Sequence, residues 1–279
     1  MDRTIDQDRP APERPEYSGR ATDRPGAEVE RGLQERDGRS RVSAHALETL
    51  CDLGRFRVIK NADLEQRRYS GNRSLMREEL RSLARQNLVQ RKTVWTGRHR
   101  DKETFWALTE QGKRLARRNG AIPSRQALYA GFVKPAELRH DAAIYPMYQK
   151  EAQRLTKEGA RIQRIVLDYE LKKKVYSPLA KAKSLPASEY ARRQSEIAEE
   201  HGLRVINGHI VLPDLRVEYE TADGSTEYID LEVATANYHG SHASEKAAAG
   251  FRMYASPDTA ERLSRALEER EIIAEIFSL

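Results

Sequence analysis

Cysteine and long apolar runs are both scarce in this chain of 279 residues. The single cysteine, Cys51, excludes a disulfide within the chain and a zinc site built from thiolates. Because Cys51 lies among Leu47, Leu50 and Leu53, we interpret it as a small core residue and not as a nucleophile. No apolar stretch reaches the length of a membrane span, and the N-terminus has no apolar signal-peptide core. We therefore expect a soluble, cytoplasmic protein without membrane contact.

The motifs of several common chemistries are missing too. The sequence contains no Gly-rich phosphate loop, no nucleophile elbow and no thiolate cluster. Charged residues make up 33% of the chain and hydrophobic residues 38%, so any core is modest and the surface is strongly ionised. The length suits one large or two ordinary domains.

Charge is distributed unevenly along the chain. Residues 1–40 contain ten acidic and eight basic residues, four prolines and four glycines, and almost nothing apolar. Such a segment cannot bury enough surface to offset the entropy of ordering, so we expect a disordered arm. Residues 41–120 carry 19 Lys and Arg against nine Asp and Glu, a net charge of +10, whereas the whole chain carries +6. The basic excess therefore belongs to one domain.

Residues 41–120 have the pattern of three helices followed by a β-hairpin. Ser43 and Asn61 can cap the first two helices, and Asn72 opens a third that runs to about Asn87. The predicted strands of the hairpin are Leu88–Thr96 and Lys102–Leu108. Three helices followed by a hairpin with a basic tip resemble a winged helix-turn-helix.

The third helix carries four arginines spaced four residues apart, which places them along one stripe: Arg73, Arg77, Arg81 and Arg85. A recognition helix needs guanidinium groups on one face and short polar residues at its N-terminal end, near the base edges. Arginine stripes also occur on ordinary solvated helices, where Glu78 could pair with them locally. The stripe, the basic tip and the localised charge together indicate binding to double-stranded DNA. The predicted DNA contacts are Asn72, Arg73, Ser74, Arg77, Arg81, Arg98 and Arg100.

Two segments with alternating polarity, Ile210–Glu220 and Thr226–Ala236, predict a second hairpin. Ala222-Asp223-Gly224 suits a three-residue loop in which glycine takes the left-handed position. That loop pairs Thr221 with Ser225. The resulting register sets two pairs opposite each other: Asp214 with Glu232, and Arg216 with Asp230.

Two facing carboxylates repel each other by up to about 1 kcal/mol unless something offsets their charge. One interpretation is a Mg²⁺ or Mn²⁺ ion held by Asp214, Asp230 and Glu232, because hard carboxylate oxygens are the ligands that such ions prefer. The other interpretation is a solvated polar face on which Arg216 is the local counter-ion.

The acidic residues of this hairpin resemble the core of the PD-(D/E)XK nuclease superfamily. Pro213-Asp214 lies on one strand and Asp230-Leu231-Glu232 on the next, as the superfamily places an acid on one strand and acid-x-Lys on the following one. Ala234 stands where the lysine is expected, and Lys246 is a candidate for a migrated replacement. The resemblance thus implies Asp214, Glu232 and Lys246 as catalytic residues.

Residues 121–134 are predicted to be a linker, and residues 135–279 a mixed three-layer α/β domain. In that domain we expect a long helix from Pro135, a strand at Arg161–Leu171, and an insertion at residues 172–202 that touches DNA phosphates.

Three further residues of this domain are candidates for chemistry. Asp141 could line an acidic site, although an acid at a helix start is also favoured by the helix dipole. His239 and His242 are either metal ligands or hydrogen-bonding residues of a Gly/Ser turn.

The whole chain is thus predicted to be α/β (α+β), with a winged helix-turn-helix before a nuclease-like domain. Over residues 41–279 this pairing resembles the replication-relaxation family of mobile-element proteins. The resemblance implies a sequence-directed, nucleoid-associated DNA-binding protein of a bacterial plasmid or other mobile genetic element, acting in replication, mobilisation or transcriptional control. The alternative is a metal-dependent DNA endonuclease. We expect Mg²⁺ or Mn²⁺ as a cofactor only if the nuclease-like site is active, no small-molecule substrate, and leave a homodimer open.

Overall fold

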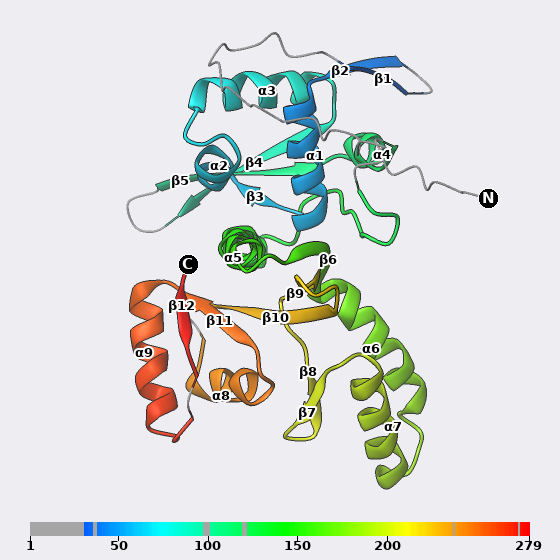
Figure 1. Ribbon diagram of the computed structural model, residues 1–279, viewed down its shortest axis with the longest axis vertical. Helices are drawn as coiled ribbons and strands as arrows, with labels where there is room; N and C mark the ends of the chain where they lie inside the picture. Colours follow the sequence, from blue (N-terminus) through cyan, green and yellow to red (C-terminus); the bar gives the residue numbers. More distant parts are fainter. Residues whose placement is uncertain (1–30, 36–37, 97–100, 119–121, 237, 273) are drawn as a thin grey trace, which may run out of the picture.

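The computed structural model describes residues 31–35, 38–96, 101–118, 122–236, 238–272 and 274–279. It is a mixed α/β structure, as predicted, in which a helical part with a small sheet lies above a part built on a larger sheet (Figure 1). Among the described helices, none has both the length and the apolar character that crossing a membrane requires.

The first part, residues 42–118, is built from helices around a three-stranded antiparallel sheet with strand order β3-β5-β4. Its elements are α1 (Ala44–Phe56), β3 (Ile59–Lys60), α2 (Asn61–Asp63), the π-helical turn η1 (Leu64–Arg68), α3 (Arg73–Arg85), β4 (Val89–Thr96), β5 (Asp101–Leu108) and α4 (Glu110–Arg118).

Two of the three predicted helix caps are confirmed. The Ser43 hydroxyl accepts a hydrogen bond from the backbone N–H of Ala46 at 3.0 Å. The Asn72 side chain accepts one from the N–H of Leu75 at 3.1 Å. Asn61 is not a cap, because its side-chain oxygen accepts a hydrogen bond from the indole N–H of Trp106 at 3.0 Å.

The predicted disordered arm needs correction at its end. Two strands, β1 (Arg31–Glu35) and β2 (Gly38–Val42), form an antiparallel pair there. The arm prediction was based on average composition, which does not detect a short pairing between neighbouring backbone segments. The rest of the arm, residues 1–30 and 36–37, lies outside the described residues.

The second part contains a five-stranded sheet with strand order β12-β11-β10-β9-β6. Strand β9 is antiparallel to both of its neighbours, whereas β10, β11 and β12 are parallel. The elements are α5 (Leu138–Lys157), β6 (Arg161–Leu167), α6 (Asp168–Ala182), α7 (Ala187–Glu200), β7 (Arg204–Ile206), β8 (His209–Val211), β9 (Leu215–Glu220), β10 (Thr226–Ala234), α8 (Gly240–Ala248), β11 (Arg252–Ala255), α9 (Pro257–Glu268) and β12 (Ile276–Ser278).

Helices cover this sheet on both faces. Val217 and Val233 belong to the same buried cluster as Leu155 of α5. Successive strand residues face opposite ways, so Ala234 and its neighbours on that side pack instead with Leu263 of α9. The second part therefore has three layers: α5, the sheet, and α8 with α9 (Figure 1).

Helix α5 also joins the two parts. The Tyr145 ring of α5 meets Phe56 of α1 edge-on at 5.1 Å between ring centroids, and Tyr148 packs on Phe56 at 4.9 Å. The Tyr145 hydroxyl donates a hydrogen bond to Asp52 of α1 at 3.3 Å. One hydrophobic cluster consequently runs from α1 through α5 into the large sheet.

The predicted linker is bound to its surroundings. The Gln126 side chain, which is 3% exposed, accepts a hydrogen bond from the N–H of Ile165 at 2.9 Å and donates one to its carbonyl at 3.0 Å. An amide side chain thus hydrogen-bonds to the edge of β6 as a neighbouring strand does.

Two predicted strands of the second part are wrong in extent. The first ends at Leu167, and Asp168 begins α6, so Lys172–Lys174 lie within this helix. Leu171, Val175 and Leu179 recur at four-residue spacing, and burial of that face outweighs the short alternation before it. The second strand, Ile210–Glu220, is interrupted before Leu215; its first residues form β8, which pairs with β7 and not with the large sheet.

Candidate nucleic-acid interface and candidate acidic site

A groove of about 690 Å³ lies between α3 and the β4–β5 hairpin. Its charged lining consists of six cationic and two acidic side chains: Lys60, Arg73, Arg77, Arg81, Arg91 and Lys102, with Glu65 and Glu103. We call this surface the basic groove. Its net charge of +4 is part of the net charge of +10 carried by residues 41–120.

The arginine stripe lies along this groove because of the helical period. Met76, Leu80 and Leu83 of α3 are buried, which turns Arg77 and Arg81 toward solvent. Arg73 is 61% exposed and lies 3.7 Å from Glu65, so its ion pair is weak and solvated. Three of the predicted DNA contacts therefore line one concave surface.

Glu103 does not cancel the groove's positive potential. Lys60 lies 2.7 Å from one of its carboxylate oxygens, and Arg139 of α5 lies 2.9 Å from the other. Burial alone raises the pKa of Glu103, but the hydrogen bonds from these two cations outweigh it and hold the pKa below its usual value. Glu103 is thus an ionised counter-ion that belongs to the protein's own packing.

The remaining predicted DNA contacts are placed differently. Ser74 is exposed at the first turn of α3, whereas the oxygen of Asn72 is engaged as the helix cap. Arg98 and Arg100 lie outside the described residues. Three cations that line the basic groove were missed from the sequence: Lys60, Arg91 and Lys102. Trp95, which is 67% exposed on β4, was not singled out either. The position of Trp95 next to the predicted basic hairpin tip could have marked it as a candidate contact.

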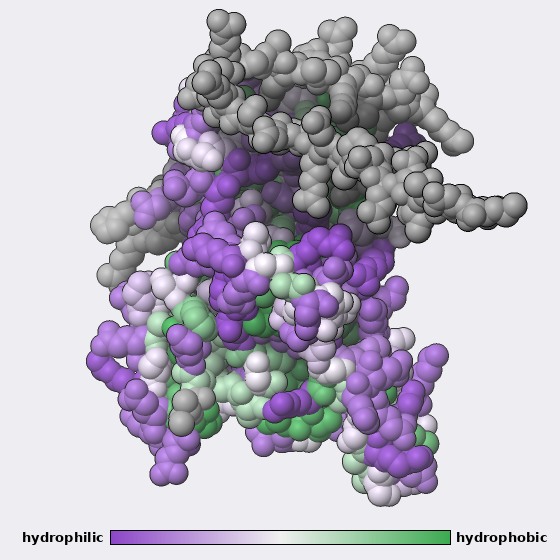
Figure 2. Space-filling model, viewed as in Figure 1, coloured by the Kyte–Doolittle hydropathy of each residue, from purple (hydrophilic) through white to green (hydrophobic). Residues whose placement is uncertain are grey.

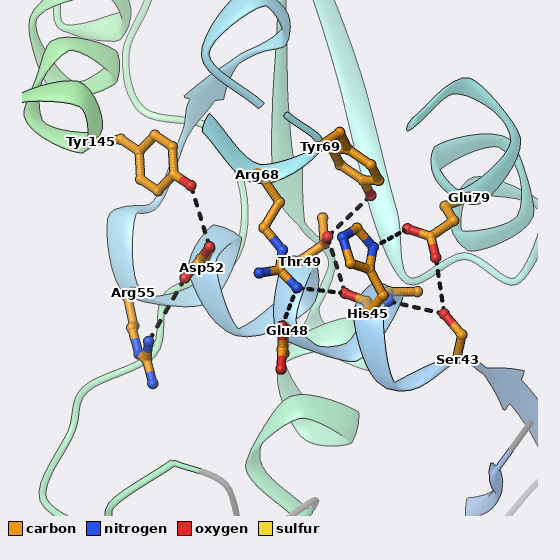
Figure 3. Close-up of polar contacts among 11 residues, drawn as sticks. Ser43, His45, Glu48, Thr49, Asp52, Arg55, Arg68, Tyr69, Glu79 and Tyr145 are labelled. Carbon is orange, nitrogen blue, oxygen red and sulfur yellow. Dashed lines mark hydrogen bonds and ion pairs between the residues drawn. The ribbon is translucent and has the colours of Figure 1, made fainter. Parts of the chain in front are cut away.

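A buried polar cluster holds α3 against α1 (Figure 3). Glu79 of α3, which is 8% exposed, accepts a hydrogen bond from the Ser43 hydroxyl at 2.9 Å and lies 2.9 Å from Nδ1 of His45. Beside it, the hydroxyls of Thr49 and Tyr69 are 3.0 Å apart. These hydrogen bonds join different elements, so the cluster fixes the orientation of α3 and of its arginines relative to α1.

The predicted register of the second hairpin is confirmed. Arg216 pairs with Asp230 across β9 and β10, and the N–H of Thr221 donates to the carbonyl of Ser225 at 2.9 Å. Gly224 takes the left-handed conformation with φ of 87°. This register brings the two predicted catalytic acids together just before β9 begins.

Asp214 and Glu232, which we call the acidic pair, are both buried and cross-linked through backbone groups. The N–H of Asp214 donates to Glu232 Oε2 at 3.2 Å, and the N–H of Val233 donates to Asp214 Oδ2 at 2.8 Å. Hydrogen bonds from backbone N–H groups stabilise the ionised carboxylates and fix their positions.

Lys246 of α8 reaches the acidic pair. Its ammonium lies 2.8 Å from Glu232 Oε1 and donates to the carbonyl of Leu212 at 2.6 Å. The Tyr238 hydroxyl donates to the same Glu232 oxygen at 2.8 Å. Burial, reinforced by the charge of Asp214, raises the pKa of Glu232 to about 7, and Lys246 and Tyr238 act against that rise.

A histidine supplies the second cation. Nε2 of His140, on the first turn of α5, lies 3.2 Å from Asp214 Oδ2, and its Nδ1 lies 3.4 Å from Asp141 Oδ1. Hydrogen bonds with Asp141 and then Asp214 raise the pKa of His140 to about 10, so it is protonated at neutral pH. Asp141 in turn lies 3.3 Å from the guanidinium of Arg57. Sequence patterns do not predict the His140–Asp214 contact, because 74 residues separate the two side chains.

The other predicted metal ligands do not join the acidic pair. Asp230 forms a two-point ion pair with Arg216, at 2.7 and 2.8 Å. His239 and His242 lie with ring centroids 6.0 Å apart at the start of α8. Within the described ranges, no group of three or more His, Cys, Asp or Glu side chains is positioned to hold a metal ion. Arg216 is thus the counter-ion of Asp230, whereas His140 and Lys246 neutralise Asp214 and Glu232.

The protein therefore combines a basic groove in its first part with an internally neutralised acidic pair in its second. A scan against protein-family models and a search of curated proteins found no match to this chain. The chemistry of these two sites is accordingly the basis for assigning a function.

Proposed function

We propose that this chain is a sequence-directed protein that binds double-stranded DNA through a winged helix-turn-helix formed by residues 42–118. The observation that carries the proposal is the basic groove, in which six cations face two acids between a helix and a β-hairpin. The element order and the antiparallel β3-β5-β4 sheet support it as well.

In this proposal α3 enters the major groove, which is about 12 Å wide and admits one helix. Arg73 and Ser74 at the N-terminal end of α3 meet base edges. Arg81 of α3 and Arg91 of β4, which also line the groove, contact phosphates. The Glu79 cluster keeps α3 in place while the arginines engage.

The test is fluorescence anisotropy of the full chain with a labelled duplex across a salt titration. Affinity should fall steeply with salt, and Arg77→Ala should weaken binding and reduce the logarithmic salt slope by about one. Arg192→Ala on α7 removes an exposed arginine that does not line the groove and should leave both quantities unchanged. Binding that is flat across the salt titration contradicts the proposal.

For the second part we propose a nuclease-like fold of PD-(D/E)XK type that serves binding or assembly. The order α5-β6-(α6, α7)-β9-β10-α8-β11-α9 supports this assignment, as does the contact between Asp214, which directly precedes β9, and Glu232 on β10. Service to a mobile genetic element, in replication, mobilisation or transcriptional control, is part of the same proposal.

A metal-dependent endonuclease is the second candidate, favoured by one observation: Lys246 reaches Glu232 although it does not follow it at the usual spacing. Asp214 and Glu232 would be the ligands of a Mg²⁺ or Mn²⁺ ion, which would polarise a phosphate. The residues fit such an ion poorly, because His140 and Lys246 already contact carboxylate oxygens.

A plasmid-nicking assay separates these two candidates. We expect no nicking by the wild type with Mg²⁺ or Mn²⁺. Nicking that disappears in Asp214→Asn and persists in Asp223→Asn, an exposed acid of the hairpin loop, would establish the endonuclease instead.

A further inference from the structure

Helix α6 exposes a row of alternating aromatic and basic side chains that neither site above uses. Tyr169, Lys172, Lys173 and Tyr176 are all exposed and occur at positions i, i+3, i+4 and i+7, which lie on one helix face. We call these four residues the tyrosine–lysine row. The opposite face, with Leu171 and Val175, is buried against α7.

The exposure of both tyrosines distinguishes this row from an ordinary solvated helix face. Tyr169 is 58% exposed and Tyr176 is 51% exposed, so neither ring is buried in the hydrophobic core. The Tyr169 ring contacts two neighbours, with the Arg57 guanidinium 5.3 Å from its centroid and the Tyr129 ring at 6.1 Å. A seven-residue separation puts the two tyrosines about 10 Å apart along the helix.

The charge of the row suits a phosphate backbone. Lys172 pairs with Asp168, and Lys174, beside the row, lies 3.1 Å from Glu170. No ion pair joins Lys173 to another residue of the described ranges. Between Asp168 and Lys183 there are five lysines and two acids, so a positive excess remains after these pairs form.

The row begins beside the acidic pair. The N–H of Asp168, the first residue of α6, donates to the carbonyl of Asp214 at 3.0 Å. From there α6 leads away from the sheet, with α7 packed along it (Figure 1). Purple, hydrophilic residues dominate that end of the molecule (Figure 2). A bound chain that follows the row, such as a nucleic-acid strand, would therefore run outward from the edge of the large sheet.

From this geometry we infer that the tyrosine–lysine row binds single-stranded nucleic acid. Bases stack on exposed aromatic rings while ammonium groups contact phosphates, and every base offers a ring face for such stacking. A duplex is a poorer occupant, because its bases are already stacked on one another and leave the tyrosines without partners. The row is a second surface, separate from the basic groove that takes the duplex.

The test uses the full chain and labelled single strands of about 20 nucleotides, oligo-dT and oligo-rU, which distinguish DNA from RNA as the occupant. Tyr176→Ala should weaken binding about five- to a hundred-fold, in line with the loss of one stacked base. Tyr176→Phe keeps the ring and should bind like the wild type. Lys173→Ala should weaken binding, whereas Lys181→Ala, on the same helix but off the row, should not.

Duplex binding is measured on the same variants so that the two surfaces are judged separately. Tyr176→Ala should leave duplex affinity unchanged, and Arg77→Ala should reduce it. The inference is overturned if the wild type binds neither oligonucleotide at low salt. It is overturned equally if Tyr176→Ala binds like the wild type, or if Lys181→Ala loses as much affinity as Lys173→Ala.

Discussion

The imidazole of His140 lies 3.2 Å from the carboxylate of Asp214, so a cation of the protein itself occupies one side of the acidic pair. Lys246 occupies the other side through Glu232. Two acids brought together by a β-hairpin would repel each other, and two cations from different helices offset that repulsion. Each acid of the pair thus contacts a cationic side chain of the protein.

The first prediction concerns the pH dependence of stability. The pKa of His140 is raised to about 10 from an ordinary value near 6.5, so its pairing stabilises the fold fully below about pH 6.5 and is lost as pH rises toward 10. The free energy of unfolding of His140→Gln should therefore be lower than that of the wild type at pH 6, and the difference should shrink by pH 10. Urea unfolding at several pH values measures this, with the exposed His209→Gln as control. A difference that stays constant with pH contradicts it.

Removal of the Lys246 ammonium should also destabilise the fold, by an amount that depends on pH. Lys246→Met leaves Glu232 buried without its cation, which should destabilise the fold by about 2–4 kcal/mol at pH 8. At pH 5 the loss should be smaller, because Glu232, with a pKa of about 7, is then protonated. Thermal unfolding at both pH values tests this.

Glu232→Gln in the Lys246→Met background should restore part of the stability. Lys113→Met, which breaks an exposed ion pair with Glu110, serves as control. If Lys246→Met lowers the stability of the fold equally at pH 5 and pH 8, Glu232 is not ionised at pH 8.

The two ends of the basic groove should differ in what they contribute to DNA binding. Arg73→Ala, at the N-terminal end of α3, should change which duplex sequences are preferred, because its guanidinium would meet base edges in the proposed docking. Lys102→Ala, on the hairpin, should weaken all sequences by a similar factor, as expected of a phosphate contact. Selection from a randomised duplex pool followed by anisotropy distinguishes these outcomes. An unchanged sequence preference in Arg73→Ala would mean that α3 does not read bases.

Gln126 should contribute more to the stability of the fold than is usual for a residue in a segment that connects two parts of a chain. Gln126→Ala leaves the buried N–H and carbonyl of Ile165 without their side-chain partner, which should cost about 2 kcal/mol of unfolding free energy. Gln163→Ala, whose side chain bonds only to Glu220, should cost much less. Urea unfolding compares the two, and similar midpoints would show that water replaces the lost bonds.

Local rules predicted the parts of this structure that depend on a few neighbouring residues. The left-handed Gly224 and the facing polar residues set the register from Thr221 to Glu232. The caps Ser43 and Asn72, and the spacing of the α3 arginines, are local as well. The same rules failed at α6, where an alternating start conceals a helix whose buried face only α7 completes.

The partners of buried charges were beyond local rules. From the hairpin alone, Arg216 was the nearest cation to all the acids, yet it pairs only with Asp230. His140 and Lys246 arrive from α5 and α8, and their positions depend on how whole helices pack on the sheet. Gln126 likewise needs the edge of β6 beside it, which its own neighbours in sequence do not reveal.

Helix α5 packs with Phe56 of α1 on one side and with the large sheet on the other, inside one continuous core. The two parts should therefore unfold in a single thermal transition and not in two independent ones. If α3 holds a duplex as proposed, the duplex would keep a constant angle to the sheet and to α6, because α5 packs against both parts. If the basic groove and the tyrosine–lysine row bind paired and unpaired strands as proposed, this packing would set the direction in which the unpaired strand leaves the duplex.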